Sequence, residues 1–139
     1  MESKFYVAVS FFIEYKEKIL IGKRASWKKT GAGIWEVPAG TVIKGEQPIE
    51  TVIREAKEEL GINVSEPVLF DSYYFERDNK EYILLNYSCK ATFIPNKIVS
   101  KEHDELRWVN KREANRYLCF DLQKKTLERY YKLKEKNCL

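Results

Sequence analysis

Three glutamates near the middle of the chain could support metal-dependent chemistry. Glu55, Glu58 and Glu59 stand at positions i, i+3 and i+4, and this spacing places their carboxylates on one arc of a helix. Like charges on one arc repel one another, and they do so more strongly where the helix is partly buried. A hard divalent cation would relieve the repulsion, because carboxylate oxygens suit magnesium, which shares its coordination shell with waters and substrate phosphates. The spacing therefore indicates a magnesium site at which water attacks a phosphate.

A helix must hold these glutamates. Pro48 suits a first helical position and Gly61 suits a helix stop. Between them, apolar residues recur at helical spacing and predict one stripe that packs on a sheet. The residues of the stripe are Ile49, Val52, Ile53, Ala56 and Leu60. The competing interpretation is a solvated acidic helix face, stabilised by pairs such as Arg54 with Glu58.

The surrounding residues favour the metal site. From Gly40 to Ile62 the sequence is GTVIKGEQPIETVIREAKEELGI. It resembles the Nudix box, the signature of the Nudix (MutT-like) hydrolases, with no substitution at any defining position. A chance match is on the order of 10⁻⁷ if each exact letter occurs at about 7%. The resemblance covers essentially the whole chain and implies a metal-dependent diphosphate hydrolase.

The resemblance also implies roles for the residues of the box. Glu58 and Glu59 are direct metal ligands, while Glu55 is a further ligand or the base that orients the attacking water. The backbone carbonyl of Ala39, which precedes the box glycine Gly40, commonly joins them. Many relatives carry a second glycine at the position of Ala39, but a carbonyl ligand depends on the shape of the backbone rather than on a side chain.

Two charged residues of the box are implied to support the metal site. Glu46 and Arg54 hold the loop and the helix together in the family, and Gly40 is also implied to support the site. The alternative for Glu46 and Arg54 is a plain surface charge. The ion implied is Mg2+, with Mn2+ as an alternative ion.

A further carboxylate often comes from a distant loop in the family, and Lys101 to Val109 is similar to that loop. Glu102 is the candidate, as a catalytic and metal-binding residue, and Glu105 is its competitor. His103, the single histidine of the chain, is expected to be solvated, with proton transfer as the alternative. Arg24 stands where relatives often touch substrate phosphate, and its guanidinium fork suits two phosphate oxygens.

Recognition of the base is expected near the last helix. Tyr117, Phe120 and Asp121 precede it, where relatives can bind the base. Phe120 is available for stacking and Asp121 for hydrogen bonds. Asp121 could instead be the N-cap of that helix.

Composition agrees with a single domain over residues 1–139. The hydrophobic fraction is 44%, the charged fraction is 33% and the net charge is +4, which is ordinary for a globular protein and mildly favourable for anionic substrates. The first apolar run is too short to span a bilayer and lacks a cleavage site. Cys89, Cys119 and Cys138 show no paired spacing and are expected to be reduced thiols. We therefore expect a cytoplasmic protein without a membrane partner, either a monomer or a homodimer.

Aromatic and β-branched runs predict strands, and apolar periodicity predicts helices. The strands are expected at residues 5–13, 18–23, 68–76, 82–93 and 106–109, and the further helices at residues 111–117 and 122–133. The segment 26–33 is expected to be a loop that borders the substrate cleft. Mixed strands with a central and a terminal helix predict an α/β fold. The resemblance implies the Nudix fold, an α/β/α sandwich around a mixed sheet.

The expected reaction is attack of water on phosphorus in a nucleoside diphosphate linked to a further group. Nucleoside triphosphates, cleaved to monophosphate and pyrophosphate, are favoured because the chain is short; 8-oxo-dGTP is one plausible member. Dinucleoside polyphosphates, nucleotide sugars and RNA 5′ ends are the alternatives within the family, and a non-catalytic nucleotide-binding module is the alternative outside catalysis. Nucleic acid is not expected as a partner, since no compact basic and aromatic stripe is present.

Overall fold

A mixed β-sheet forms the centre of the molecule. The computed structural model describes residues 4–139. Its strands are β1 (Tyr6–Tyr15), β2 (Lys18–Arg24), β3 (Trp35–Glu36), β4 (Ala39–Thr41), β5 (Asn63–Val64), β6 (Val68–Arg77), β7 (Lys80–Phe93) and β8 (His103–Val109). The path through the sheet is β3-β2-β1-β7-β5, with β4 paired to β1, β6 to β7 and β8 to β2. The central pair, β1 and β7, is parallel, whereas the other pairs are antiparallel.

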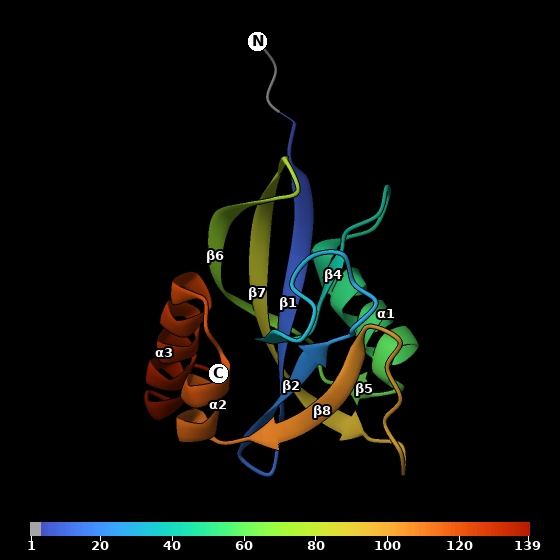
Figure 1. The fold of residues 1–139 in the computed structure, drawn as a ribbon. Helices are drawn as coiled ribbons and strands as arrows, with labels where there is room; N and C mark the ends of the chain where they lie inside the picture. The colour runs from blue at the N-terminus through green and yellow to red at the C-terminus, as the bar shows by residue number, and fades with distance from the viewer. Residues whose placement is uncertain (1–3) are drawn as a thin grey trace.

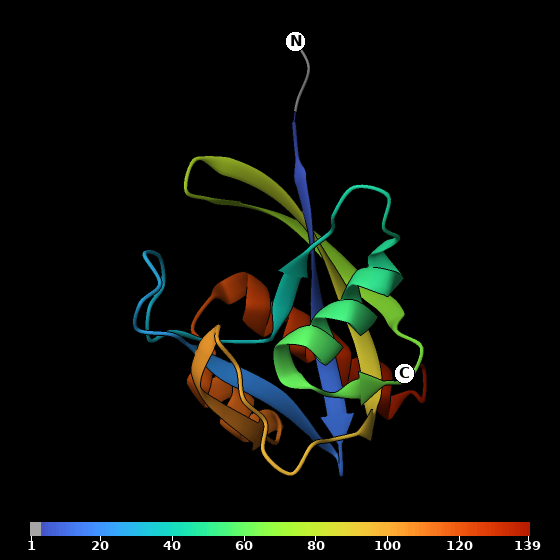
Figure 2. The same ribbon diagram turned by 90° about the vertical axis from the view of Figure 1, so that its right-hand side faces the viewer.

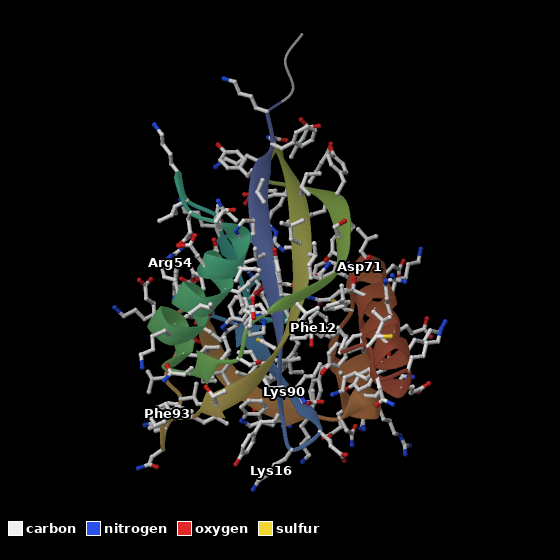
Figure 3. The ribbon with its side chains drawn as sticks, turned by 180° about the vertical axis from the view of Figure 1, so that it is seen from behind. Phe12, Lys16, Arg54, Asp71, Lys90 and Phe93 are labelled. Atoms are coloured by element: carbon white, nitrogen blue, oxygen red, sulfur yellow. The ribbon has the colours of Figure 1, made fainter. Side chains whose placement is uncertain are left out.

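Helices cover both faces of the sheet (Figure 1). α1 (Pro48–Leu60) lies on one side, and α2 (Lys111–Tyr117) and α3 (Asp121–Glu135) lie on the other. Successive side chains of β1 point to opposite faces of the sheet, where two hydrophobic cores lie. Phe11 packs in the core that includes α1, and Phe12 packs in the core that includes α3. Phe12 stacks on Tyr130 of α3 at a ring-centroid distance of 5.1 Å. Figure 3 shows Arg54 and Asp71 on opposite sides of the sheet. The predicted α/β/α sandwich is therefore confirmed.

The sequence located the long elements within two or three residues. The predicted strands correspond to β1, β2, β6, β7 and β8, and the predicted helix 111–117 coincides with α2. The short strands β3, β4 and β5 were not predicted, because segments of two or three residues carry no periodicity. No helix in residues 4–139 has the length and apolar character that a membrane crossing requires.

Two details of the helices differ from the predictions. In α1, Val52, Ala56 and Leu60 are buried, but Ile49 and Ile53 are exposed at the edge of the predicted stripe. In α3, Asp121 is the first helical residue and Phe120 is the N-cap, with no side-chain hydrogen bond to the cap. The prediction of Asp121 as the N-cap is therefore wrong, and its carboxylate at the helix N-terminus is favourable through the helix dipole instead.

Candidate active site

One cleft gathers most of the predicted site residues. Its volume is about 1090 Å³, and α1, β3, β4, the β6–β7 hairpin, the loop before β8 and the start of α3 all contribute to its lining. We call one set of its lining side chains the glutamate wall: Glu36, Glu55, Glu58, Glu59 and Glu102. We call another set the aromatic wall: Tyr73, Phe75, Tyr82 and Phe120. The cleft thus joins carboxylates to stacking surfaces.

The loop between β2 and β3 borders the cleft, as the sequence predicted. Lys28, Thr30 and Gly31 line it. The loop and the β6–β7 hairpin reach toward the same side of the molecule (Figure 2), and the Thr30 hydroxyl donates a hydrogen bond of 2.8 Å to Asp78 at the hairpin turn. The contact closes one rim of the cleft.

Glu55 lies against the backbone of β4. A Cβ atom at Gly40 would stand 2.5 Å from Glu55 Cγ, so only glycine permits this approach of helix and strand. Arg54 Nη1 donates to Glu55 Oε1 at 2.9 Å and to Glu58 Oε2 at 3.3 Å. Burial raises the pKa of Glu55 against the opposing hydrogen bond from Arg54, and Glu59 and Glu58 add to the increase. Glu55 is therefore a better proton acceptor than an exposed carboxylate.

Glu46 and Arg54 tie the loop after β4 to α1. Arg54 donates from Nε to Glu46 Oε2 at 2.7 Å and from Nη2 to Glu46 Oε1 at 3.0 Å, which is a two-point contact. The Thr51 hydroxyl also donates to Glu46 at 2.6 Å. These hydrogen bonds lower the pKa of Glu46 to about 2, with that from Arg54 the largest cause.

Glu59 reaches the deepest part of the glutamate wall. Only 7% of its side chain is exposed, and its Oε1 lies 3.2 Å from Nδ1 of His103. His103 Nε2 lies 3.4 Å from Glu36 Oε2, and Arg24 Nη1 donates to the other Glu36 oxygen at 3.0 Å. A row of alternating charge therefore runs from α1 through β8 and β3 to β2.

His103 corrects the expectation of a solvated histidine. It is 6% exposed and begins β8. Burial alone would lower its pKa, but contacts with the Glu36 and Glu59 carboxylates raise it to about 9. The same contacts act on Glu36: burial would raise the pKa of Glu36, but the hydrogen bonds with His103 and Arg24 lower it below its usual range. The two carboxylates therefore favour the protonated form of the His103 ring.

Glu102 and Glu105 lie in different surroundings. Glu102 lines the cleft and forms an ion pair with Lys28. Burial, followed by the neighbouring charge of Arg24, lowers the pKa of Lys28. Glu105 forms an ion pair with Arg107 at 2.7 Å and does not line this cleft. The structure therefore brings Glu102, and not Glu105, to the other glutamates.

The remaining predicted residues also lie at the cleft, apart from one. Ala39 and Gly40 line it from β4, and Arg24 lines it while donating from Nε to the Thr30 carbonyl at 3.0 Å. Phe120 and Asp121 line it from the start of α3. Tyr117 instead packs on Trp35, with ring centroids 4.9 Å apart, and does not line the cleft.

Comparison with known proteins decides the family. A model of the NUDIX domain matches residues 4–131. The chain belongs to the Nudix family. It is 28% identical to the asymmetrical bis(5′-nucleosyl)-tetraphosphatase of Rattus norvegicus over 99 residues, which are 68% of this chain and 67% of that protein. It is also 28% identical to the CTP pyrophosphohydrolase of Escherichia coli K12 over 114 residues, 82% of either protein.

A solved structure supports the same conclusion. The solution structure of the E. coli ORF135 protein matches this Nudix chain with a TM-score of 0.75 and 26% identity, over 94% of this chain and 91% of that one. The protein is therefore a Nudix hydrolase, an enzyme that acts on nucleoside diphosphates linked to a further group.

The Nudix glutamates suit a hard cation by their chemistry. Within residues 4–139, no three Cys, His, Asp or Glu side chains converge as in an assembled metal cage, and Arg54 and His103 contact the carboxylates. Buried Glu59 Oε1 makes no well-aligned hydrogen bond to any of the described residues, despite its closeness to His103. An oxygen-rich donor set with a buried, unsatisfied oxygen fits magnesium.

Sequence analysis missed Glu36 as part of the site and misjudged His103. Glu36 ends the two-residue strand β3 and is followed by Val37 and Pro38. No spacing pattern in the sequence links Glu36 to the glutamates of α1. No sequence signal links Glu36 to His103 either: Glu36 lies opposite Gly22 of β2, and His103 lies opposite Arg24, only once β2 pairs with β3 and β8. Charged residues far apart in sequence required that pairing to be recognised.

Proposed function

We propose that this Nudix hydrolase is a magnesium-dependent nucleoside triphosphate pyrophosphohydrolase that releases a nucleoside monophosphate and pyrophosphate. The observation that carries the proposal is the single cleft in which the glutamate wall, the basic side chains of Arg24 and Lys28, and the aromatic wall meet. A triphosphate needs these three features together, namely ligands for a cation, cations for phosphate oxygens and a flat surface for the base.

The glutamate wall carries the chemistry. Glu55, Glu58 and Glu59, together with the Ala39 carbonyl and Glu102, would hold the ion. Magnesium, when bound, supplies positive charge to the phosphate oxygens and to the leaving oxygen. Mn2+ is an alternative ion for the same oxygen donors.

Glu55 has the surroundings of a base. Its raised pKa suits it to accept a proton from the attacking water. A new bond forms between the water oxygen and a phosphorus of the triphosphate. The bond from that phosphorus to its bridging oxygen breaks, and the products are the monophosphate and pyrophosphate. Arg24 is held by Glu36 and by Thr30, so its guanidinium is fixed in place to contact phosphate.

The aromatic wall would hold the base. Phe75 and Tyr82 of the β6–β7 hairpin stack on each other with ring centroids 4.8 Å apart and an interplanar angle of 8°, and both line the cleft. Phe120, 46% exposed at the start of α3, offers a second surface, and Asp121 beside it offers hydrogen-bond acceptors. The wall supports a purine or pyrimidine, including an oxidised purine such as that of 8-oxo-dGTP.

Hydrolysis of dinucleoside polyphosphates is the second candidate. Two observations favour it: the similarity to the rat tetraphosphatase and a cleft volume of about 1090 Å³, which lies just above the usual range for small-molecule sites. Such a cleft has room for two nucleosides.

Turnover with Mg2+ across a substrate panel distinguishes the candidates. The panel comprises natural and oxidised nucleoside triphosphates, ADP-ribose, a nucleotide sugar, a dinucleoside tetraphosphate and 5′-triphosphate RNA, with products resolved by anion-exchange chromatography. Monophosphate and pyrophosphate from one triphosphate support the proposal. Preferred cleavage of the dinucleotide to monophosphate and triphosphate supports the second candidate. Nucleotide binding without turnover of any compound would assign the chain to the non-catalytic class.

Three expectations about the whole protein stay predictions. They are a single domain over residues 1–139, a cytoplasmic location and no nucleic acid partner; the oligomeric state is either a monomer or a homodimer. The cysteines agree with a reducing compartment, since Cys89, Cys119 and Cys138 are all free. Sedimentation of the purified protein would give its oligomeric state.

A further inference from the structure

The His103 ring rests directly on the backbone of β2. A Cβ atom built on Gly22 would lie 2.5 Å from Cδ2 of the ring and 2.6 Å from Cγ, both well inside contact distance. Only glycine at this position lets the ring lie flat against the strand. The β2–β8 ladder shifts register between Lys23 and Arg24, which pairs His103 with Arg24. The position of the ring is therefore set by the sheet.

Both nitrogens of the ring face the glutamate wall. Nδ1 lies 3.2 Å from Glu59 Oε1, with the Ser100 hydroxyl also at 3.2 Å, and Nε2 lies 3.4 Å from Glu36 Oε2. Arg24 donates a hydrogen bond to the other oxygen of Glu36 and so holds this carboxylate beside the ring. A histidine that merely filled the core would direct its nitrogens to backbone groups or to water. Here they contact two carboxylates that line the cleft.

Glu59 depends on this arrangement more than its neighbours do. Glu55 and Glu58 share Arg54 as a partner on their own helix. Glu59 has no ion pair with Arg54; its side chain is 7% exposed, and among the described residues its one ion-pair contact is with His103 Nδ1 at 3.2 Å. The oxygen beside the ring, Oε1, makes no well-aligned hydrogen bond, so the ring adjoins the carboxylate while the carboxylate can still bind an ion.

We propose that His103 is a positioning residue that fixes the Glu59 carboxylate for cation binding, with Gly22 and Glu36 as the supports of its ring. The inference rests on the proposed function, in which Glu59 is a metal ligand. Groups that orient metal ligands change metal affinity about 10- to 100-fold when they are removed, even where they touch neither the ion nor the substrate.

Mn2+ binding to the purified full-length protein tests the inference. Free Mn2+ is counted by electron paramagnetic resonance, without any nucleotide present. His103→Gln should weaken Mn2+ binding at least 10-fold, because one amide cannot contact both carboxylates. Glu36→Gln and Gly22→Ala should weaken it in the same direction, the first by releasing Nε2 and the second by displacing the ring. Ile21→Val, which trims a buried side chain next to Gly22 on β2, is the matched control and should bind Mn2+ like the wild type.

Steady-state kinetics supply a second readout. In His103→Gln, kcat at fixed Mg2+ should fall while KM for the nucleotide stays within about twofold, since the histidine holds an ion ligand rather than the substrate. Circular dichroism and Tm report whether each variant folds. If His103→Gln does not fold, Glu36→Gln decides the question, because it keeps the shape of the side chain.

Two results would count against the inference: one would contradict only the role of His103, and the other would also contradict the metal site. Unchanged or tighter Mn2+ binding in folded His103→Gln and Glu36→Gln, with binding lost in Glu59→Gln, would overturn the role of His103 and leave the metal site standing. Wild-type Mn2+ binding in Glu59→Gln would overturn the metal site of the proposed function, and the inference with it.

Discussion

The two walls of the cleft differ in how the chain builds them. Three residues of the glutamate wall, Glu55, Glu58 and Glu59, come from two turns of α1, so their spacing alone brings them together. The aromatic wall combines Phe75 and Tyr82 of the β6–β7 hairpin with Phe120, which lies far along the chain at the start of α3. The comparison teaches that local spacing brings the three carboxylates of α1 together, whereas the aromatic wall, like Glu36 and Glu102, depends on the assembled fold.

The largest effect is expected in the glutamate wall. Glu59→Gln should lower kcat by on the order of 100-fold or more, because it removes a ligand charge while preserving the shape of the side chain. The Tm should change little. Steady-state assays with Mg2+ measure the loss, and Lys57→Gln, an exposed change on the same helix, serves as the control. A near-normal rate in Glu59→Gln would separate the glutamate wall from the chemistry.

A smaller loss is expected at the edge of the same wall. Glu102→Gln should reduce kcat about 10- to 100-fold, since its carboxylate reaches the cleft from a loop and pairs with Lys28. Glu105→Gln should stay near the wild-type rate because Glu105 contacts Arg107 outside the cleft. The same assay compares the two variants, and the reverse order of effects would assign the loop carboxylate to Glu105.

The aromatic wall should affect binding rather than turnover. Phe75→Ala should raise KM about 10-fold, in line with the loss of one stacking contact, and should reduce discrimination among bases while kcat changes less. Tyr74→Ala, on the opposite side of the same strand and outside the cleft lining, is the control. A fall in kcat with an unchanged KM would mean that Phe75 supports the glutamate wall instead.

The smallest effect is expected on the pH dependence of thermal stability when Glu46 is replaced. The folded pKa of Glu46 is about 2, below its ordinary 4.5, so its contribution to stability is present above pH 4.5 and is lost as the pH falls through about 2. Glu46→Gln should therefore lower Tm slightly at pH 6, and the difference from wild type should shrink as the pH falls toward 2. Thermal unfolding followed by circular dichroism measures both proteins. A constant difference across this range would show that the charge of Glu46 is not what stabilises the loop.

Sequence was sufficient where neighbouring residues act together. It predicted α1, its glutamates and the long strands, because periodicity and the box are local patterns. It did not reveal that His103 is buried against Gly22 or that Glu36 binds Arg24, since these contacts arise only when β2 pairs with β3 and β8. It also placed Ile49 and Ile53 in the buried stripe, because helical spacing does not say how wide the contact with the sheet is.

Hydrolysis of one nucleoside triphosphate, followed with and without Mg2+, tests the central claim most directly. The account predicts that monophosphate and pyrophosphate appear in equal amounts with Mg2+, that a chelator stops their formation and that added Mg2+ restores it. Tight nucleotide binding with no products at any Mg2+ concentration, for every triphosphate and dinucleotide tried, would contradict it.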